Sequence, residues 1–310
     1  MKLFIYPHIQ PYEIKWTCPR TELILNEGFA KIPGVTLVDN GHEADFIIFH
    51  HVPQYKGQKS FELINKVDPK KLIVIDSIDE NNEYFLPELN PDRYFLYFKR
   101  SMVKVDNNVR TVLPFVDRQY PWDYAILDGF YQPEQEKTID VGCYLRDSCY
   151  YRSLILQYMY HWQSKNPKCN SVVGPVSDGS RSNNDGQVVF DKTYFDYLAK
   201  TKIIVSSGPY GWRGDSRGGE AVANKCLYMS NEFYDLMPNP PINGQHFVKF
   251  NPLNPQELFD SLAYLLYPLP ECIRIKDVAE AGYIHCRDYH SSEARCRYIL
   301  EKIEENNGRN

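Results

Sequence analysis

Residues 197–229 read YLAKTKIIVSSGPYGWRGDSRGGEAVANKCLYM, and this stretch decides the fold of the second half of the chain. The β-branched apolar run at 202–206 predicts a buried strand, and a glycine-rich loop follows it. Asp215 and Ser216 are good N-cap residues for a helix that ends near Ala223, and 226–229 predicts the next strand. Such a βαβ unit places its loop and helix N-terminus at the carboxyl edge of a parallel sheet, where open α/β sheets bind nucleotides and phosphates.

The start of this helix carries charged side chains that suit a nucleotide. Arg217 can donate two parallel hydrogen bonds to phosphate oxygens, and a helix N-terminus favours the same anion. Glu220, one turn later, can accept hydrogen bonds from a ribose diol. The two residues also fit an i,i+3 ion pair that only supports the helix, worth about 0.2–0.5 kcal/mol. The spacing alone leaves both interpretations open.

The motif Arg217-x-x-Glu220-Ala221 resembles the nucleotide-sugar signature in the C-terminal half of GT-B glycosyltransferases, and it is most similar to the exostosin-like (GT47-type) enzymes. The resemblance implies an α/β fold with two Rossmann-like domains facing a central cleft and a C-terminal helix crossing back to the first domain. It implies that Arg217 lies near the donor diphosphate and that Glu220 binds the donor ribose. Lys225 departs from the pattern, because the family usually has glycine before the cysteine that matches Cys226. The second glutamate of many retaining GT-B enzymes is also missing.

The resemblance extends to other residues at the same edge of the sheet. Arg146 follows the strand expected over 139–145, and Arg152 lies in the first turn of the helix expected over 150–162. In GT-B enzymes this region faces the donor diphosphate. A surface position, or for Arg146 a pair with Asp147, explains these arginines equally well. The residues expected to bind the donor are Arg146, Arg152, Ser207, Gly208, Arg213, Asp215, Ser216, Arg217 and Glu220.

The first half of the chain alternates short apolar runs with helix-length segments, a pattern that predicts a second parallel sheet with Rossmann-like winding. The expected helices cover 21–29 and 61–67, and the expected strands are 2–6, 35–38, 44–50, 71–76, 94–98 and 110–115. No G-x-G-x-x-G follows the first strand, so we do not expect a dinucleotide cofactor there.

Polar residues past the strand ends of this half are the candidates for catalysis. An inverting transfer, which the exostosin-like resemblance implies, needs a general base that takes the proton of the acceptor hydroxyl. Asp79 is our first choice for the base, and Glu80, Glu13 and His8 follow; a cap or turn role is the alternative for each of them. We expect no catalytic metal, because no D-x-D triplet lies near a strand end and arginines with a helix N-terminus can carry the diphosphate charge.

The length of 310 residues suits two domains. We expect an N-terminal Rossmann-like acceptor-binding domain at 1–117 and a linker at 118–137, where proline, aromatic and charged residues mix without periodicity. A C-terminal Rossmann-like nucleotide-sugar-binding domain is expected at 138–290. A helix at 291–310 is expected to pack back on the N-terminal domain.

Composition limits the partners and the compartment. A formal net charge of −5 argues against a nucleic-acid partner, and no stretch approaches the roughly 20 apolar residues of a membrane span. The first apolar run is too short for a signal peptide, and the eight cysteines include no C-x-x-C pair. We therefore expect a cytoplasmic protein with reduced thiols. Its expected partners are a nucleotide-sugar donor and a glycan acceptor.

These observations favour a glycosyltransferase that moves a sugar from a nucleoside diphosphate sugar, a UDP-sugar, to a hydroxyl of a glycan. A catalytically inactive GT-B-like protein that binds a sugar or nucleotide is the alternative. An NAD-dependent oxidoreductase or epimerase fits worst, because the glycine-rich loop lies in the C-terminal half and the following strand ends without an acidic residue.

Overall fold

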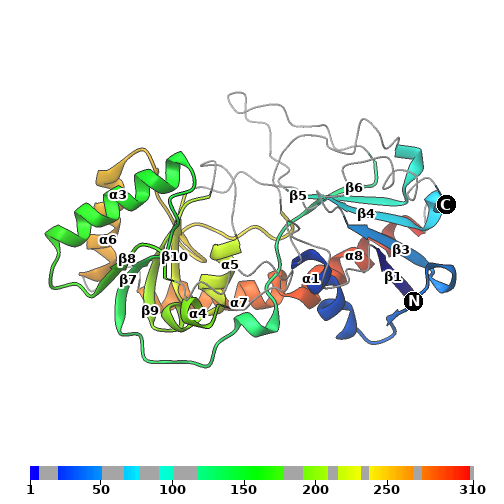
Figure 1. The fold of residues 1–310 in the computed structure, drawn as a ribbon, viewed down its shortest axis with the longest axis horizontal. Helices are drawn as coiled ribbons and strands as arrows, with labels where there is room; N and C mark the ends of the chain where they lie inside the picture. The colour runs from blue at the N-terminus through cyan, green and yellow to red at the C-terminus, as the bar shows by residue number, and fades with distance from the viewer. Residues whose placement is uncertain are drawn as a thin grey trace.

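The computed structural model describes residues 1–6, 20–50, 66–76, 91–100, 117–176, 191–208, 216–231, 237–267 and 274–307. In these ranges the chain forms two parallel sheets with helices packed on them, one toward each end of the molecule (Figure 1). The predicted α/β class is therefore confirmed. None of the helices in these ranges has the length and apolar character that crossing a membrane requires.

The first sheet has six parallel strands in the order β2-β1-β3-β4-β5-β6. Its strands are β1 (Lys2–Tyr6), β2 (Thr36–Leu37), β3 (Phe46–His50), β4 (Leu72–Asp76), β5 (Leu96–Arg100) and β6 (Gln119–Trp122). Every residue of β4 and β5 is buried, as expected for central strands of a parallel sheet covered on both faces. Short 3-10 turns are η1 (Gly41–Glu43), η3 (Pro69–Lys71), η4 (Pro91–Arg93) and η5 (Asp128–Phe130).

Strand β6 lies inside the segment that the sequence assigned to the linker, 118–137. Among the described strands it pairs only with β5, at the edge of the sheet, and Pro121 lies opposite Lys99. Proline lacks the N–H that a central strand needs for its second neighbour, but an edge strand tolerates it. The strand expected over 110–115 and residues 61–65 of an expected helix lie outside the described ranges.

The second sheet has five parallel strands in the order β11-β10-β9-β7-β8. These strands are β7 (Ile139–Cys143), β8 (Ser171–Val173), β9 (Thr201–Val205), β10 (Leu227–Ser230) and β11 (Val248–Lys249). One face packs against α3 (Tyr150–Lys165), α6 (Pro255–Leu266) and the start of α7 (Ile275–His290). The other face packs against α4 (Lys192–Ala199) and α5 (Ser216–Ala223). The strand predicted at 202–206, the helix that follows the glycine-rich loop and the strand predicted at 226–229 are present as β9, α5 and β10, whereas residues 209–215 of the loop lie outside the described ranges.

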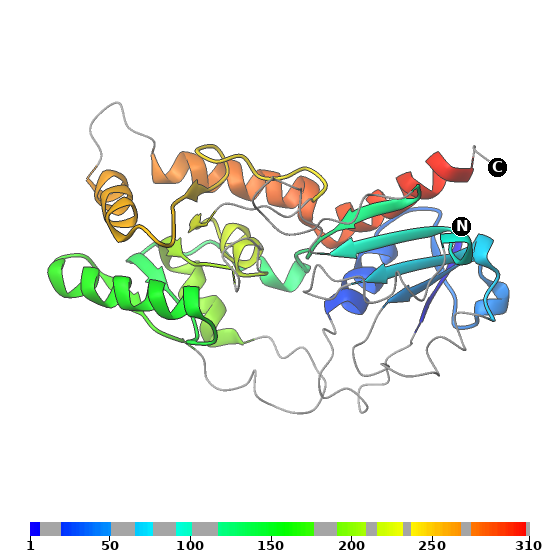
Figure 2. The ribbon, with the colours of Figure 1, turned by 90° about the horizontal axis from the view of Figure 1, so that it is seen from above.

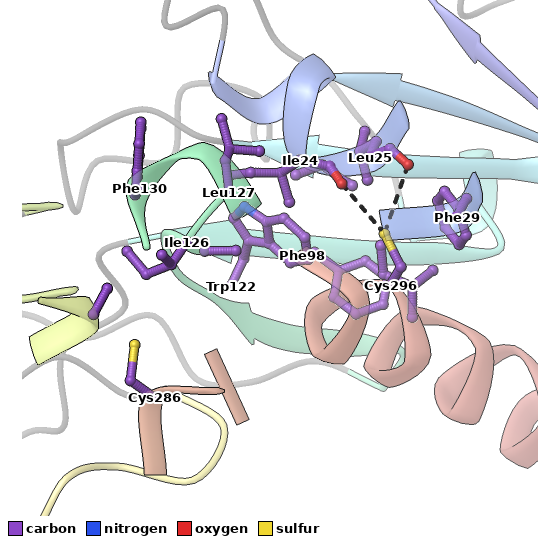
Figure 3. Packing of buried hydrophobic residues seen from close by; sticks show 14 of the residues in the cluster. Ile24, Leu25, Phe29, Phe98, Trp122, Ile126, Leu127, Phe130, Cys286 and Cys296 are labelled. Carbon is purple, nitrogen blue, oxygen red and sulfur yellow. Dashed lines mark hydrogen bonds between the residues drawn. The ribbon is translucent and has the colours of Figure 1, made fainter. Parts of the chain in front are cut away.

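The last two helices join the two sheets. Helix α7 lies on the second sheet, and α8 (Ser292–Asn307) continues from it onto the first, so the pair extends along the molecule in both views (Figures 1 and 2). On the first sheet α8 packs against α1 (Arg20–Ala30), where the Sγ of Cys296 donates to the carbonyl oxygens of Ile24 and Leu25 at 3.7 and 3.8 Å (Figure 3). The predicted helix that crosses back to the first domain is confirmed.

The chain passes between the sheets twice, and the two crossings lie side by side. The N–H of Ile126, in the first crossing, donates to the carbonyl of His290 at 2.8 Å. The N–H of Ser292, in the second crossing, donates to the carbonyl of Ile126 at 3.0 Å. Apolar residues of the first crossing, Ile126 and Phe130 among them, join one hydrophobic core that reaches both sheets (Figure 3). The joint between the domains is therefore a packed and hydrogen-bonded structure.

Candidate functional site

The carboxyl edge of the second sheet brings together polar residues from three neighbouring strands. Strand β9 ends at Val205 and is followed by buried residues 206–208, and β10 ends beside buried Asn231. Strand β7, on the other side of β9, leads through residues 144–149 into α3. Because the strands are parallel, all these segments meet at one edge, where open α/β sheets bind their ligands.

Asn231 organises the centre of this edge. Its Oδ1 accepts from the Ser207 hydroxyl at 3.1 Å and from the Gly208 backbone N–H at 3.0 Å. The amide thus fixes the chain where it leaves β9 and enters the glycine-rich loop. Asn231 was not among the predicted site residues, although a polar residue directly after the strand at 227–230 was a usable signal.

Arg152, one of the predicted phosphate ligands, reaches this centre from α3. Its Nε donates to the Ser207 carbonyl at 3.4 Å, and its Nη1 donates to the Ser148 hydroxyl at 3.0 Å. Arg146 lies in the same β7–α3 connection with its side chain exposed. The structure therefore groups Arg152, Ser207 and Gly208, which were predicted separately from two parts of the sequence.

Arg217 lies in the first turn of α5 and reaches toward the end of β7. Burial raises the pKa of the Cys143 thiol to about 12, and the nearby positive charge of Arg217 opposes that rise. Cys143 is the last residue of β7, so the Arg217 guanidinium lies at the same edge as Arg152. Two arginines from different helices thus lie at one edge of the sheet, an arrangement that suits the binding of an anionic group.

Glu220, the predicted ribose ligand, is fully buried on α5. Its Oε2 accepts a hydrogen bond from the Tyr194 hydroxyl of α4 at 2.9 Å. Tyr194 is itself held at the N-terminus of α4, where the Asp191 carboxylate accepts from its backbone N–H at 2.9 Å. Tyr194 was not among the predicted site residues, because its contact with Glu220 depends on how α4 and α5 meet in three dimensions.

The two glycines of α5 allow close packing around the site. A Cβ added at Gly218 would lie 3.0 Å from the Tyr228 ring, and one added at Gly219 would overlap the Ile126 side chain. Gly219 therefore lets α5 rest against the first crossing between the domains. The first turn of α5 is consequently positioned relative to both domains.

The residue that follows the C-terminal end of α5 has the left-handed backbone conformation that glycine usually adopts, although it is Lys225. Lys225 has a φ of +52°, in the left-handed region. Its N–H bonds the Val222 carbonyl at 2.9 Å, and the Cys226 N–H bonds the Ala221 carbonyl at 3.1 Å, the pair of bonds that defines a Schellman C-cap. The departure from the family pattern at Lys225 changes the side chain and leaves the backbone turn in place.

The carboxyl edge of the first sheet carries a second group of buried charges. Asp76, the last residue of β4, accepts from the Tyr97 hydroxyl at 2.8 Å and lies 3.4 Å from the Lys99 ammonium. On the other face of β5, the Arg100 guanidinium lies 3.8 Å from the centre of the Tyr124 ring. These contacts fix the ends of β4 and β5, and the segment that contains Asp79 follows β4 in the sequence.

Some predicted site residues lie outside the described ranges. Among the donor-binding residues these are Arg213 and Asp215, and Ser216 begins the described part of α5. The four candidates for the general base, His8, Glu13, Asp79 and Glu80, also lie outside. Their roles remain predictions from the sequence.

Comparison with known proteins gives matches at the level of structure. No model of a protein family matches the sequence, and no curated protein matches it. HepE of Anabaena, solved with UDP and glucose, is 11% identical over 98% of this chain and 99% of HepE, with a TM-score of 0.54. Sucrose-phosphate synthase of Thermosynechococcus elongatus is 9% identical over 86% of this chain and 75% of the synthase, with a TM-score of 0.54. TarM is 11% identical over 83% of this chain and 54% of TarM, with a TM-score of 0.50.

The similarity to HepE extends over nearly the whole of both chains, so it includes the two sheets, their connection and the terminal helices. The chain therefore has the GT-B fold, with two Rossmann-like domains. At these low identities the comparison establishes the fold alone.

Proposed function

We propose that this protein is a glycosyltransferase that takes a sugar from a nucleoside diphosphate sugar and transfers it to a hydroxyl group of a glycan. The observation that carries the proposal is the carboxyl edge of the second sheet, where Arg152 and Arg217 come from two different helices. Two guanidinium groups beside a helix N-terminus match the charge and hydrogen-bonding needs of a diphosphate.

The donor is a UDP-sugar in this proposal. HepE, which shares the fold over nearly its full length, was solved with UDP and glucose. In this chain the arginines would bind the diphosphate, and Glu220, with one carboxylate oxygen held by Tyr194, would bind the ribose. The motif that contains Arg217 and Glu220 supports a relation to the exostosin-like enzymes.

The proposed reaction inverts the anomeric configuration and uses no metal. A single displacement needs one general base on the acceptor side, and Asp79 is the first candidate for it. Positive charge from the two arginines would stabilise the leaving diphosphate.

We also propose a cytoplasmic location. The cysteines of the described ranges are free thiols, as expected in a reducing compartment: Cys143, Cys149, Cys169, Cys226, Cys286 and Cys296.

Two measurements on the full chain test the proposed function. Calorimetry compares UDP binding by the wild type, Arg217→Ala, Arg152→Ala and the control Arg297→Ala, whose exposed side chain bonds Glu293 on α8, the helix that packs on α1. We expect each site variant to bind UDP about 10-fold or more weakly, or roughly 1.5–3 kcal/mol, and the control to bind as the wild type does. Equal UDP affinity in all four proteins would contradict the proposal that Arg152 and Arg217 bind the donor.

The second measurement is release of nucleoside diphosphate from a panel of donors, with and without acceptor glycans. Release that depends on an acceptor supports a transferase. Binding of UDP without any release across the panel would instead identify a GT-B-like protein that binds nucleotides without turnover.

A further inference from the structure

Three histidines line a cavity of about 90 Å³ beside the crossings between the domains. His285 and His290 come from the last part of α7, and His246 comes from the segment before β11. The His246 and His285 rings stack with their centres 4.1 Å apart, and the His285 and His290 ring centres are 5.1 Å apart. The proposed sugar transfer uses none of these residues.

The hydrogen bonds of the cluster require neutral rings at His290 and His246. Arg295 Nη2 lies 2.5 Å from His290 Nδ1, and because a guanidinium can only donate, this ring nitrogen accepts. The proton of His290 is therefore on Nε2, which donates to the Asn239 carbonyl at 3.0 Å. His246 Nδ1 likewise accepts, from the Ile242 N–H at 3.0 Å.

The same assignment argues against a metal site at this cluster. The Nε2 atoms of His285 and His290 are 3.3 Å apart, a separation that two ligands of one metal ion also show. However, His290 Nε2 carries a proton as long as Arg295 donates to Nδ1, so it has no lone pair for a metal. Both Nε2 atoms instead lie 3.0 Å from the Asn239 carbonyl oxygen.

Burial and the positive charge of Arg295 disfavour protonation of the histidines in the cluster. Arg295 is fully buried. Burial, followed by the charge of Arg295, holds the pKa of His290 well below its usual value, and burial also lowers the pKa of His285 and His246. Among the described residues, the charged or titratable groups that face the cluster are Arg295 from α8, Cys286, Asp288 and Tyr289 from α7, Asp123 from the segment after β6, and, beyond Asp123, Arg100 from β5.

The cluster is directly connected to both crossings. The His290 carbonyl accepts the N–H of Ile126, which is the bond that joins the crossings. Arg295 Nε donates to the Tyr124 carbonyl of the first crossing at 3.4 Å while Nη2 donates to His290. One buried guanidinium therefore holds the second crossing to the first.

We propose that these histidines make the orientation of the two domains sensitive to acid. When His290 takes up a proton on Nδ1, the Arg295–His290 hydrogen bond is replaced by repulsion between two cations. Arg295 then loses its fixed position against the Tyr124 carbonyl, and the paired crossings loosen. His285 and His246, which stack beside His290, add to the repulsion when they are protonated.

Proton linkage determines whether acid stabilises or destabilises the joint between the domains. A histidine whose pKa is lowered by folding binds fewer protons in the folded state than in the unfolded state. The same holds for the joint, in which the packed crossings lower the pKa of the histidines. The packed joint is therefore favoured above the ordinary histidine pKa of about 6.5, and it is progressively lost as the pH falls below that value.

Small-angle X-ray scattering of the full chain from about pH 8 to about pH 5 tests this proposal, because this interval contains the histidine titration. Far-UV circular dichroism on the same samples reports whether the domains stay folded. The variants are His290→Asn, which keeps an acceptor for Arg295 and cannot titrate, and His285→Asn. The control is His161→Asn, an exposed histidine on α3 away from the joint.

We expect the radius of gyration of the wild type and of His161→Asn to increase reversibly on acidification while the dichroism stays constant. His290→Asn should lose most of this increase, and His285→Asn part of it. A wild-type radius that does not change with pH would overturn the proposal, as would an unchanged increase in His290→Asn. Loss of dichroism over the same pH interval would also overturn it, because the acid effect would then be unfolding. The wild-type titration decides these points even if a variant fails to fold.

Discussion

Lys225 offers a test of backbone strain in which glycine should stabilise the chain more than alanine does. The residue lies at the C′ position of α5 with a φ of +52°. A left-handed conformation costs a non-glycine residue about 1–2 kcal/mol, whereas glycine adopts it without that cost. Glycine's greater freedom in the unfolded chain offsets roughly 0.5–1 kcal/mol of this advantage. Lys225→Gly should therefore be more stable than Lys225→Ala by about 0.5–1 kcal/mol.

The Lys225 side chain decides how each variant compares with the wild type. Its ammonium lies 3.1 Å from Glu280 and 3.7 Å from Glu134, in partly exposed ion pairs. Such pairs typically contribute about 0.2–1 kcal/mol. Lys225→Gly loses the pairs and the strain together, so we expect its free energy of unfolding to stay close to that of the wild type. Lys225→Ala loses only the pairs and should be less stable.

Urea unfolding followed by circular dichroism measures these differences, provided that the slope m is the same in all variants. Lys200 gives a matched control, because it is an exposed lysine at the end of α4 with an ordinary φ of −94°. There the order should reverse, and Lys200→Gly should be less stable than Lys200→Ala by about 0.5–1 kcal/mol. If alanine equals or exceeds glycine at Lys225, the strain argument is refuted.

The other predictions concern the site and the joint. Tyr194→Phe removes a donor to Glu220 and should weaken UDP binding several-fold, about 1 kcal/mol, in calorimetry; unchanged affinity would show that the Tyr194 hydroxyl has no part in donor binding. Asp79→Asn should retain UDP binding but lower kcat by about 100-fold or more, and a normal kcat would place the general base elsewhere. Activity should survive exhaustive chelation, whereas a strict requirement for Mn²⁺ would contradict the proposed metal-free mechanism. Gly219→Ala should reduce stability by roughly 1–3 kcal/mol through overlap with the Ile126 side chain, and Gly129→Ala, which meets no atom within 4 Å, gives the control in the same unfolding assay.

Helices and strands could be predicted from the sequence where the spacing of apolar residues and the helix-capping residues indicate the same element. The run before Ser207 and the N-cap residues near Ser216 located β9 and α5. Strand β6 was assigned to the linker because residues 118–137 mix proline, aromatic and charged residues without periodicity, and Pro121 lies within the strand itself. An edge strand needs hydrogen bonds on one side only, so its sequence carries a weaker signal.

The site was less accessible to prediction, because its contacts join residues that are distant in the chain. The Tyr194–Glu220 bond depends on the packing of α4 against α5, and the sequence contains no pattern for it. The same holds for the histidine cluster, where His246 meets His285 only through the position of α7 on the second sheet. Residue type and strand ends predicted which edge carries the polar groups, and the tertiary packing determined their partners.

The packing of α8 on α1 has a consequence for the order of events during synthesis. Gly28 of α1 lies so close to the Ser292 carbonyl that a Cβ there would overlap it, and Phe29, Ile299 and Ile303 share one buried cluster. The ribosome makes the strands of the first sheet early, but α8 appears only some 260 residues after α1: the hydrogen bond between Ser292 and Glu27 joins residues that are 265 positions apart. Until then one face of the nascent N-terminal domain keeps apolar side chains in water. We therefore expect the half that is translated first to complete its folding last, and to be the half that recruits chaperones on the ribosome.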